Sequence, residues 1–317
     1  MTTDGSARID SDRDGEPDDA EIARLFVELA GRQISYLAAG DPAALLAIVL
    51  VHGSGVSARY WINQLRDLRE AARVVAIDLP GHGKSDPIHT ASVEQYAEAV
   101  AKVLEVLGTG PVIVVGHSLG GAVAISLAAR RPDRVIGLVL LSSCAKLPEV
   151  ESVWGRFLPY FPGPLRKLLF FSMAQKLLFA PGVESRAVSL GMQELRSCRP
   201  ETILSDLHAA KAMDLTQAAT RVDAPTLIMC GSRDRLTPPE LSRRLSDLIP
   251  RSRLHLVEGA GHMLLLEVPA HVSREILAFA RSIAGPGTVP SLTVVLRRGR
   301  SLIRRLLRWV WRPRQRV

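Results

Sequence analysis

The stretch that decides the fold is Pro111-Val-Ile-Val-Val-Gly116-His-Ser118-Leu-Gly120-Gly121. Its first five residues are rich in β-branched side chains and predict a short buried strand, and an apolar helical pattern follows over residues 122–130. In the G-x-S-x-G segment between them, glycine removes the Cβ atoms that would collide where strand and helix crowd together. We therefore expect a tight turn that projects the Ser118 hydroxyl clear of the backbone, the geometry of a nucleophile elbow.

Apolar runs alternate with helical patterns on both sides of this stretch. Such alternation predicts an α/β fold with a mainly parallel sheet and helices on both of its faces. Before the alternation begins, residues 25–29 and 33–38 are expected to form a hairpin around Gly31. The predicted parallel strands are 45–51, 73–79, 111–115, 135–141, 224–230 and 254–257, and the predicted helices between and after them are 57–70, 92–107, 122–130, 239–248 and 269–283.

The alternation stops over residues 143–222, where no convincing strand occurs and prolines break several helical segments. An all-helical insertion between two strands of one sheet predicts a lid over the carboxyl edge of that sheet. We accordingly divide the chain into an α/β core (22–142 and 223–286), this helical lid (143–222) and two terminal segments. The terminal segments are a leader (1–21) and a tail (287–317).

Charge is distributed unevenly along the chain, whose formal net charge is +8. Residues 291–317 contain nine Arg and no acidic residue, whereas residues 1–21 contain eight acidic residues and two Arg. The acidic leader carries no signal-peptide pattern and is expected to be disordered. Three cysteines are too few for a disulfide framework, which favours a reducing compartment and a cytoplasmic protein. No apolar run is long enough to predict a membrane-spanning helix.

Ser118 would need a base to accept its proton and an acid to orient that base. In a parallel sheet, loops that follow later strands can reach the same edge. Asp234 follows the strand predicted to end at Cys230, and His262 follows the strand predicted to end at Val257. We therefore predict a catalytic set of Ser118, Asp234 and His262, with His262 as general base and then general acid.

An oxyanion formed at Ser118 would also need hydrogen-bond donors. The backbone N–H of Leu119, directly after Ser118, is one candidate, and the second is expected from the loop His52-Gly-Ser54-Gly55, most simply from Ser54. His52 itself is interpreted as a brace for that loop. Asp78 and Asp86 are interpreted as turn-forming and helix-capping residues rather than catalytic ones.

These motifs carry a family resemblance over roughly residues 25–284. The chain resembles an α/β-hydrolase of the lidded serine esterase and lipase type, similar to monoacylglycerol lipases. The matching segments are His52-Gly-Ser-Gly, Asp78-Leu-Pro-Gly-His-Gly-Lys-Ser85, Gly116-His-Ser-Leu-Gly-Gly121, Gly231-Ser-Arg-Asp234 and Gly259-Ala-Gly-His262. The same family includes C–C bond hydrolases, thioesterases and lactonases, so the resemblance implies fold and triad more strongly than substrate. Its epoxide hydrolases and dehalogenases use an Asp nucleophile, which Ser at position 118 argues against.

Aromatic residues gather in the first part of the insertion. Five of the seven Phe, together with Trp154 and Tyr160, lie between positions 154 and 179. One interpretation is that they form the ordinary core of the lid. The other is that they form a hydrophobic acyl pocket or a lipid-docking surface. The pocket candidates are Trp154, Phe157, Tyr160 and Phe161.

The tail combines apolar and basic residues at helical spacing. Its apolar and arginine side chains would occupy opposite faces of a helix, a pattern that favours the surface of an anionic membrane. Nucleic acid is the less favoured partner, because binding to phosphates would leave the apolar face of the helix exposed. The third alternative is that the tail packs on the core or is disordered. The residues expected to contact a membrane are Leu302, Ile303, Arg304, Arg305, Leu306, Leu307, Trp309 and Trp311.

Taken as a whole, the sequence predicts a serine hydrolase of lipophilic carboxylic esters, attached peripherally to a membrane. A C–C bond hydrolase with the same triad and a non-catalytic lipid-binding module on the same scaffold remain as alternatives. We expect no cofactor and no metal, since the sequence shows neither a cluster of metal ligands nor a phosphate-binding glycine loop.

Overall fold

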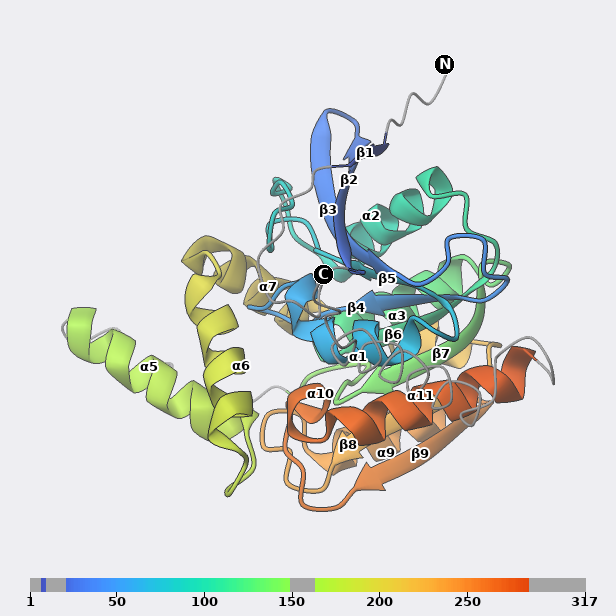
Figure 1. The fold of residues 1–317 in the computed structure, drawn as a ribbon. Coiled ribbons are helices and arrows are strands. Elements are labelled where there is room, and N and C mark those ends of the chain that lie inside the picture. The colour runs from blue at the N-terminus through green and yellow to red at the C-terminus, as the bar shows by residue number, and fades with distance from the viewer. Residues whose placement is uncertain (1–6, 10–20, 149–162, 285–317) are drawn as a thin grey trace, which may run out of the picture.

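The structure is a computed structural model that describes residues 7–9, 21–148 and 163–284. Its described strands form one nine-stranded sheet in the order β1-β2-β3-β5-β4-β6-β7-β8-β9 (Figure 1). The first three strands pair antiparallel with one another, and β3 pairs antiparallel with β5. These three are β1 (Ala7–Ile9), β2 (Ala23–Leu29) and β3 (Arg32–Ala39).

From β5 onward all neighbouring strands are parallel, as the alternating sequence pattern predicts. Their carboxyl ends therefore lie at one edge of the sheet, where loops after different strands can meet. The six strands are β4 (Ala47–Val51), β5 (Arg73–Ile77), β6 (Val112–His117), β7 (Val135–Leu141), β8 (Thr226–Gly231) and β9 (Ser252–Val257).

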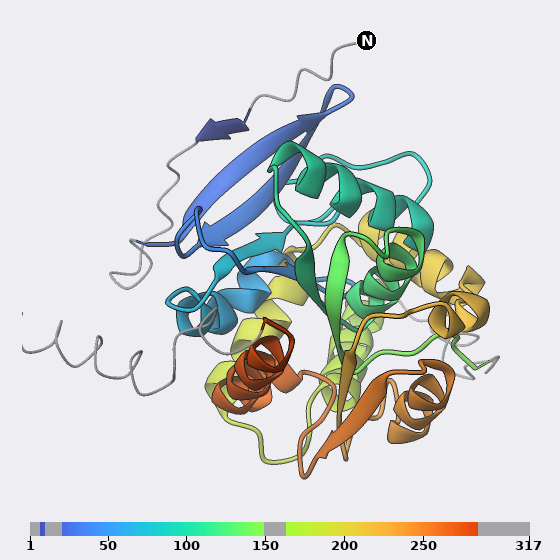
Figure 2. The ribbon, with the colours of Figure 1, turned by 90° about the vertical axis from the view of Figure 1, so that its right-hand side faces the viewer.

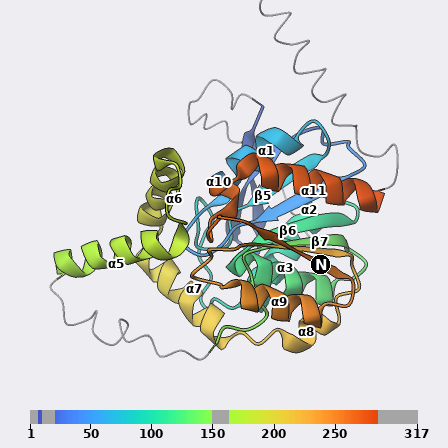
Figure 3. The ribbon, with the colours of Figure 1, turned by 90° about the horizontal axis from the view of Figure 1, so that it is seen from below.

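Helices cover both faces of this sheet, and Figures 2 and 3 show the two layers on either side of the strands. In β4, Val49 and Val51 face a core shared with α2 and α3, whereas Ile48 and Leu50 face the core shared with α1 and α11. A strand buried on both faces has no polar side to alternate with, which explains its continuous apolar run. The core helices are α1 (Ile62–Leu68), α2 (Val93–Val106), α3 (Leu119–Arg130), α9 (Pro239–Leu248), α10 (Leu264–Glu267) and α11 (Pro269–Ala284).

In its described residues, 143–148 and 163–222, the insertion contains no strand, and its described helices lie in the second of these ranges. Figure 1 shows α5 to α7 beside the sheet, with α5 reaching away from the body. Buried residues such as Met192 and Leu195 of α6 join the core on the α1 side. The four helices are α5 (Gly163–Leu178), α6 (Ser185–Ser197), α7 (Pro200–Ala212) and α8 (Thr216–Thr220).

Several boundaries differ from the sequence prediction. Helix α3 begins at Leu119, three residues early, because helical backbone starts directly after the turn at Ser118. Leu45 is 91% exposed, and β4 begins only at Ala47. The helix expected over 57–70 is divided into a 3₁₀ turn (Ala58–Trp61) and α1.

The largest departure is β1, which lies within the leader for which we expected disorder. Ala7–Ile9 contains no acidic residue and pairs with β2, which would otherwise form the edge of the sheet. The short helix α10 was not predicted, because four residues give no periodic signal. None of the helices within the described ranges combines the length and apolarity that a bilayer-spanning helix needs.

Candidate active site

Ser118 lies at the junction of β6 and α3, in a strained backbone conformation. Its φ of 53° and ψ of −120° lie in a region that residues other than glycine rarely adopt. Two hydrogen bonds maintain this backbone conformation. The Ser118 N–H donates to Leu141 O at 2.9 Å, and the Ser118 carbonyl accepts from Ser143 Oγ at 2.8 Å. A Cβ at Gly116 would collide with the carbonyl of Gly120, so strand and helix approach here as closely as the motif predicts. The Ser118 side chain is only partly buried and remains accessible.

Asp234 and His262 come together from the loops after β8 and β9. Asp234 Oδ2 lies 2.9 Å from His262 Nδ1, and both side chains are almost wholly buried. The other carboxylate oxygen, Oδ1, accepts the backbone N–H groups of Leu236 and Thr237, each at 2.9 Å. Hydrogen-bond donors from both loops therefore fix the Asp234 carboxylate beside the imidazole.

This environment determines which nitrogen of His262 can act as a base. Burial favours the neutral acid and would raise the pKa of Asp234, but the nearby His262 and the hydrogen bonds from His262 and Thr237 outweigh it and hold that pKa below its usual range. An ionised carboxylate only accepts, so Nδ1 of His262 must carry the proton. Its Nε2 is then left with a lone pair, the state that a general base requires.

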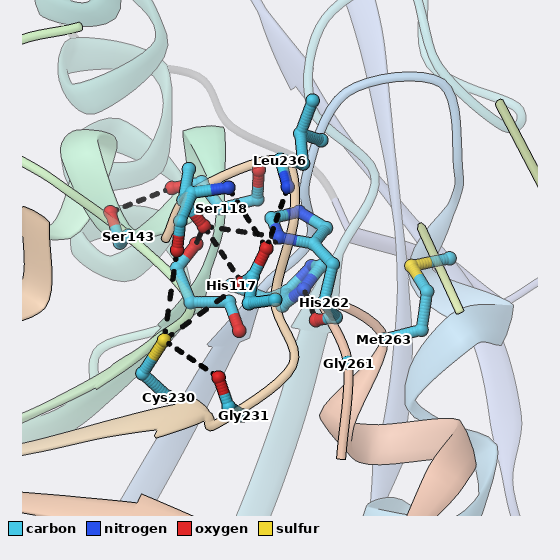
Figure 4. A network of polar contacts seen from close by, with 12 residues as sticks. His117, Ser118, Ser143, Cys230, Gly231, Leu236, Gly261, His262 and Met263 are labelled. Carbon is cyan, nitrogen blue, oxygen red and sulfur yellow. Dashed lines mark hydrogen bonds and ion pairs between the residues drawn. The ribbon is translucent and has the colours of Figure 1, made fainter. Parts of the chain in front are cut away.

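His117 connects the Ser118 turn to the His262 loop. Its Nε2 lies 3.0 Å from the carbonyl oxygen of His262, and the two ring centroids are 4.9 Å apart. Burial lowers the pKa of His117 to about 3, with His262 as a further cause, so His117 is neutral and donates through Nε2. Figure 4 shows Ser118, His117 and His262 together. Among the hydrogen bonds of the described residues, none joins the Ser118 hydroxyl to His262, and such bonds often form only when substrate is bound.

The loop proposed to complete the oxyanion site lies against Ser118. A Cβ at Gly53 would be 3.0 Å from Ser118 Cβ and 3.1 Å from His117 Nδ1, so a larger residue here would crowd both neighbours. Ser54 follows Gly53 and is exposed, and Leu119 is the buried first residue of α3. The N–H groups at a helix N-terminus lack partners within the helix and favour negative charge. That the N–H groups of Ser54 and Leu119 stabilise an oxyanion stays a prediction.

His52 has the bracing contacts that we expected, whereas Asp78 and Asp86 contact segments distant in sequence. The His52 ring is fully buried, with Nε2 accepting from Leu79 N–H at 3.0 Å. Asp78 is fully buried and forms an ion pair with Arg24 at 2.8 Å. Asp86 accepts the backbone N–H of Gln33 at 2.8 Å. These contacts hold loops against the sheet. They give each of the three side chains a structural role that requires no part in catalysis.

The predicted pocket residues Trp154, Phe157, Tyr160 and Phe161 lie outside the described residues. The same holds for the whole tail, including the expected membrane contacts over 302–311. The site built above therefore consists of core elements alone.

Three residues at this site were missed by sequence reasoning. The Thr237 hydroxyl lies 3.1 Å from Nδ1 of His262, and His117 contacts the His262 carbonyl as described. Glu267 of α10 accepts the backbone N–H groups of Gly261 and Met263 at 2.8 and 3.2 Å. Thr237 carries a weak signal, because a hydroxyl residue three positions after Asp is typical of a capped turn. Neither His117 nor Glu267 has a local signal. The partner of His117 is distant in sequence, and Glu267 lies in a helix of only four residues.

Within the described residues, one group of His, Cys, Asp and Glu side chains is close enough together to hold a metal ion. It consists of His255, His271 and Glu275 and lies between β9 and α11. Asp234 and His262 do not belong to it.

Comparison with known proteins agrees with this architecture. Residues 47–269 match the family described as the alpha/beta hydrolase fold. The chain is 30% identical over 230 residues to a pimeloyl-(acyl-carrier protein) methyl ester esterase of Neisseria meningitidis serogroup C, which covers 70% of this chain and 88% of the relative. It is 31% identical over 266 residues to a 2-hydroxy-6-oxo-2,4-heptadienoate hydrolase of Pseudomonas putida, covering 78% of this chain and 92% of the relative.

A solved structure extends the comparison. The crystal structure of a membrane phospholipase A, a bacterial virulence factor, superposes with a TM-score of 0.72 at 26% identity. The superposition covers 84% of this chain and 88% of the other. Two kinds of ester hydrolase and one keto-acid hydrolase are thus similar to this chain.

Proposed function

Because the chain belongs to the α/β-hydrolase family, we propose that it is a serine hydrolase that cleaves lipophilic carboxylic esters through an acyl-enzyme intermediate. The observation that carries the proposal is the 2.9 Å contact between Asp234 and His262 at the same sheet edge as the strained Ser118 turn. This arrangement supplies an oriented base beside an accessible hydroxyl, which is what acyl transfer needs.

The first half of the reaction makes the acyl-enzyme. The Ser118 hydroxyl attacks the ester carbonyl while Nε2 of His262 takes its proton, and Asp234 stabilises the imidazolium that forms. The N–H groups of Leu119 and Ser54 are proposed to bind the oxyanion, and one such donor is typically worth about 10²–10³ in rate. The intermediate collapses when His262 gives its proton to the departing alcohol, leaving the acyl group on Ser118.

The second half repeats these roles with water. His262 removes a proton from a water molecule that attacks the acyl carbonyl, and the new oxyanion uses the same donors. Collapse returns the proton to Ser118 Oγ and releases the carboxylic acid. Neither half needs a group beyond the chain and water.

The preference for lipophilic esters rests on the surface of the lid. Among the described residues, four of the six exposed large hydrophobic side chains lie on lid helices: Leu165 and Leu168 on α5, and Leu204 and Leu207 on α7. A fifth, Leu236, follows Asp234 by two residues and is 42% exposed. Exposed apolar side chains on the lid are in keeping with a substrate that carries an acyl chain rather than with a small polar ester.

Peripheral membrane attachment through the tail is part of the same proposal. It rests on the amphipathic, arginine-rich sequence of residues 302–311. The similarity to a membrane phospholipase A is in keeping with it. We expect the protein in the cytoplasm, held at a membrane surface.

One specific observation favours a second candidate function. The Pseudomonas putida relative is named for a keto acid and not for an ester. Hydrolysis of a C–C bond in a vinylogous diketone would use the same Ser118, His262 and Asp234, so the triad does not separate the two reactions.

The test is the initial rate of hydrolysis of p-nitrophenyl esters of increasing acyl length, with wild type and Ser118→Ala. We expect a rate that depends on Ser118 and peaks at medium or long chains, and a loss of about 10³-fold or more in Ser118→Ala. Ser54→Ala keeps its backbone N–H and should retain most of the rate; a loss of 10²-fold would assign the donor to its hydroxyl instead.

The other outcomes separate the alternatives. If only the acetate ester were hydrolysed, the proposed serine esterase mechanism would stand, but the preference for lipophilic esters would be contradicted. Turnover of a vinylogous diketone with negligible esterase activity would favour the second candidate. The absence of Ser118-dependent turnover on either class would favour a binding module. Deleting residues 287–317 should leave soluble-ester rates intact but abolish binding to anionic vesicles, and unchanged binding would contradict a membrane role for the tail.

A further inference from the structure

A second cluster of chemically versatile side chains lies between the last strand and the last helix of the described chain. His255 belongs to β9, and His271 and Glu275 belong to α11. The possible ligand atoms of all three lie within 4.8 Å of one another. His255 Nδ1 lies 3.5 Å from Glu275 Oε2, and the two imidazole centroids are 5.1 Å apart.

The fold explains why these three residues meet. Val257 of β9 packs into the core on the α11 side, and His255, two residues earlier, points to the same face of the sheet. On α11, His271 and Glu275 are four residues apart and therefore share one side of the helix. They precede the buried Val272 and Ile276 by one residue each, so they lie along the border of the packed face.

We propose that His255, His271 and Glu275 form a zinc site with a water molecule as fourth ligand. Two imidazole nitrogens and one carboxylate oxygen suit Zn²⁺, whereas Ca²⁺ and Mg²⁺ prefer oxygen ligands alone. Ligands at about 2.0–2.1 Å from a tetrahedral ion lie about 3.4 Å apart. The 3.5 Å between His255 and Glu275 already matches this, and small rotations of partly exposed side chains bring in His271.

The surroundings leave the site open to solvent, and the side chain of Arg253 is turned away from it. The side chains of His255 and Glu275 are 37% and 27% exposed, so an ion and its water can enter from solvent. Arg253, on the same face of β9, directs its guanidinium to the Phe279 ring, 5.9 Å from the centroid. Phe279 lies one helical turn beyond Glu275, so this cation is turned away from the cluster.

A metal ion here would join the two elements that flank the loop carrying His262. That loop runs from the end of β9 to the start of α11 and includes α10. A bound ion would therefore stabilise an edge strand of the sheet against the helix that covers it. The site is separate from Ser118 and takes no part in the chemistry proposed there.

The test uses the full chain, freed of metal with a chelator and titrated with Zn²⁺ by calorimetry. We expect one equivalent to bind and to raise the melting temperature, because an ion that binds only the folded state stabilises it. His255→Asn, His271→Asn and Glu275→Gln should each weaken binding at least tenfold and remove the thermal shift. His208→Asn, a change at an exposed histidine of α7, is the matched control and should bind as wild type.

Titration with Co²⁺ distinguishes binding at this defined site from non-specific binding to the surface. Co²⁺ held by this set should give the visible absorption of a tetrahedral complex, and that signal should vanish in His255→Asn, which leaves the helical pair intact. The proposal is overturned if the three variants bind Zn²⁺ as tightly as wild type, or if wild type binds no better than the triple variant. In that case the cluster is an ordinary surface ion pair between His255 and Glu275.

Discussion

The hydroxyl of Thr237 lies 3.1 Å from Nδ1 of His262, the same nitrogen that Asp234 contacts at 2.9 Å. The hydroxyl also lies 2.9 Å from Asp234 Oδ2 and 3.0 Å from the carbonyl oxygen of Ser142. Thr237 thus ties the Asp234–His262 pair to the end of β7, the strand beside the one that carries Ser118. It touches no reacting atom and acts as a positioning residue.

Replacing Thr237 by Val should therefore lower kcat by about 10–100-fold and leave KM nearly unchanged. The magnitude follows from a hydrogen bond to a charged group, about 1.5–3 kcal/mol, which here orients the base and does not bind substrate. Steady-state kinetics on a p-nitrophenyl ester measure both parameters. Thr237→Ser keeps the hydroxyl and should recover most of kcat; equal losses in both variants would show that the methyl group matters instead.

Asp206 on α7 should be a main attachment of the lid to the core. Its buried carboxylate lies 2.9 Å from His82 Nε2 and accepts the Tyr96 hydroxyl at 2.7 Å. Removing one member of a buried polar pair costs about 3–5 kcal/mol. We expect Asp206→Ala to lose that much free energy of unfolding in urea and to expose α7 to limited proteolysis.

Tyr96→Phe provides the graded comparison, because it removes only the hydroxyl that Asp206 accepts. A loss of about 1.5–3 kcal/mol is expected from a single hydrogen bond to a charged group. Were Asp206→Ala to lie within 1 kcal/mol of wild type, the lid would have to be held by its other contacts, such as those of Arg199 and Thr202 with the carbonyl oxygen of Gly81 at 2.7 and 3.0 Å.

The crowding at the Ser118 turn can be tested with two glycines of the same segment. A Cβ at Gly116 would collide with backbone atoms of Gly120, whereas a Cβ at Gly110 would meet nothing within 4 Å. Gly116→Ala should cost at least about 2–3 kcal/mol of unfolding free energy, at the upper end of overpacking effects. Gly110→Ala should be neutral or stabilising by up to about 1 kcal/mol. Similar urea midpoints for the two variants would contradict the close approach of β6 and α3.

Stability should fall as the solution is acidified below neutral pH. Burial lowers the pKa of His52 to about 4 and that of His117 to about 3, whereas an unfolded histidine titrates near 6.5. Between these values the unfolded chain binds protons that the folded chain does not, so the free energy of unfolding rises with pH. For the two residues together, we expect a loss of about 3–4 kcal/mol between pH 7 and pH 5.

Urea unfolding at several pH values measures this loss. His117→Asn keeps a side-chain donor for the His262 carbonyl but no longer titrates, so it should reduce the pH dependence by about half. An unfolding free energy that stays flat from pH 7 to pH 5 would mean that both rings are protonated in the folded protein.

How much of this protein follows from its sequence depends on how local each signal is. The buried strands and their helices were predictable because apolar runs, Ser92 as an N-cap and the G-x-S-x-G turn are each complete within a few residues. Boundaries were less predictable: Leu45 extends the apolar run of β4 but is exposed, and only the packing around it decides that.

The chain order of Ser118, Asp234 and His262 was sufficient to propose a catalytic set, because parallel strands bring the loops at their carboxyl ends to one edge. What only the tertiary structure decided are the contacts between segments far apart in sequence. His117 meets the carbonyl of His262 across 145 positions, and Asp206 meets His82 across 124. His255 meets Glu275 only because β9 and α11 pack together. The sequence by itself determined most of the elements, their order and the residues able to do chemistry. Tertiary packing decided which side chains orient those residues. The reason is that side chains from distant segments share no period or spacing that a linear pattern could reveal.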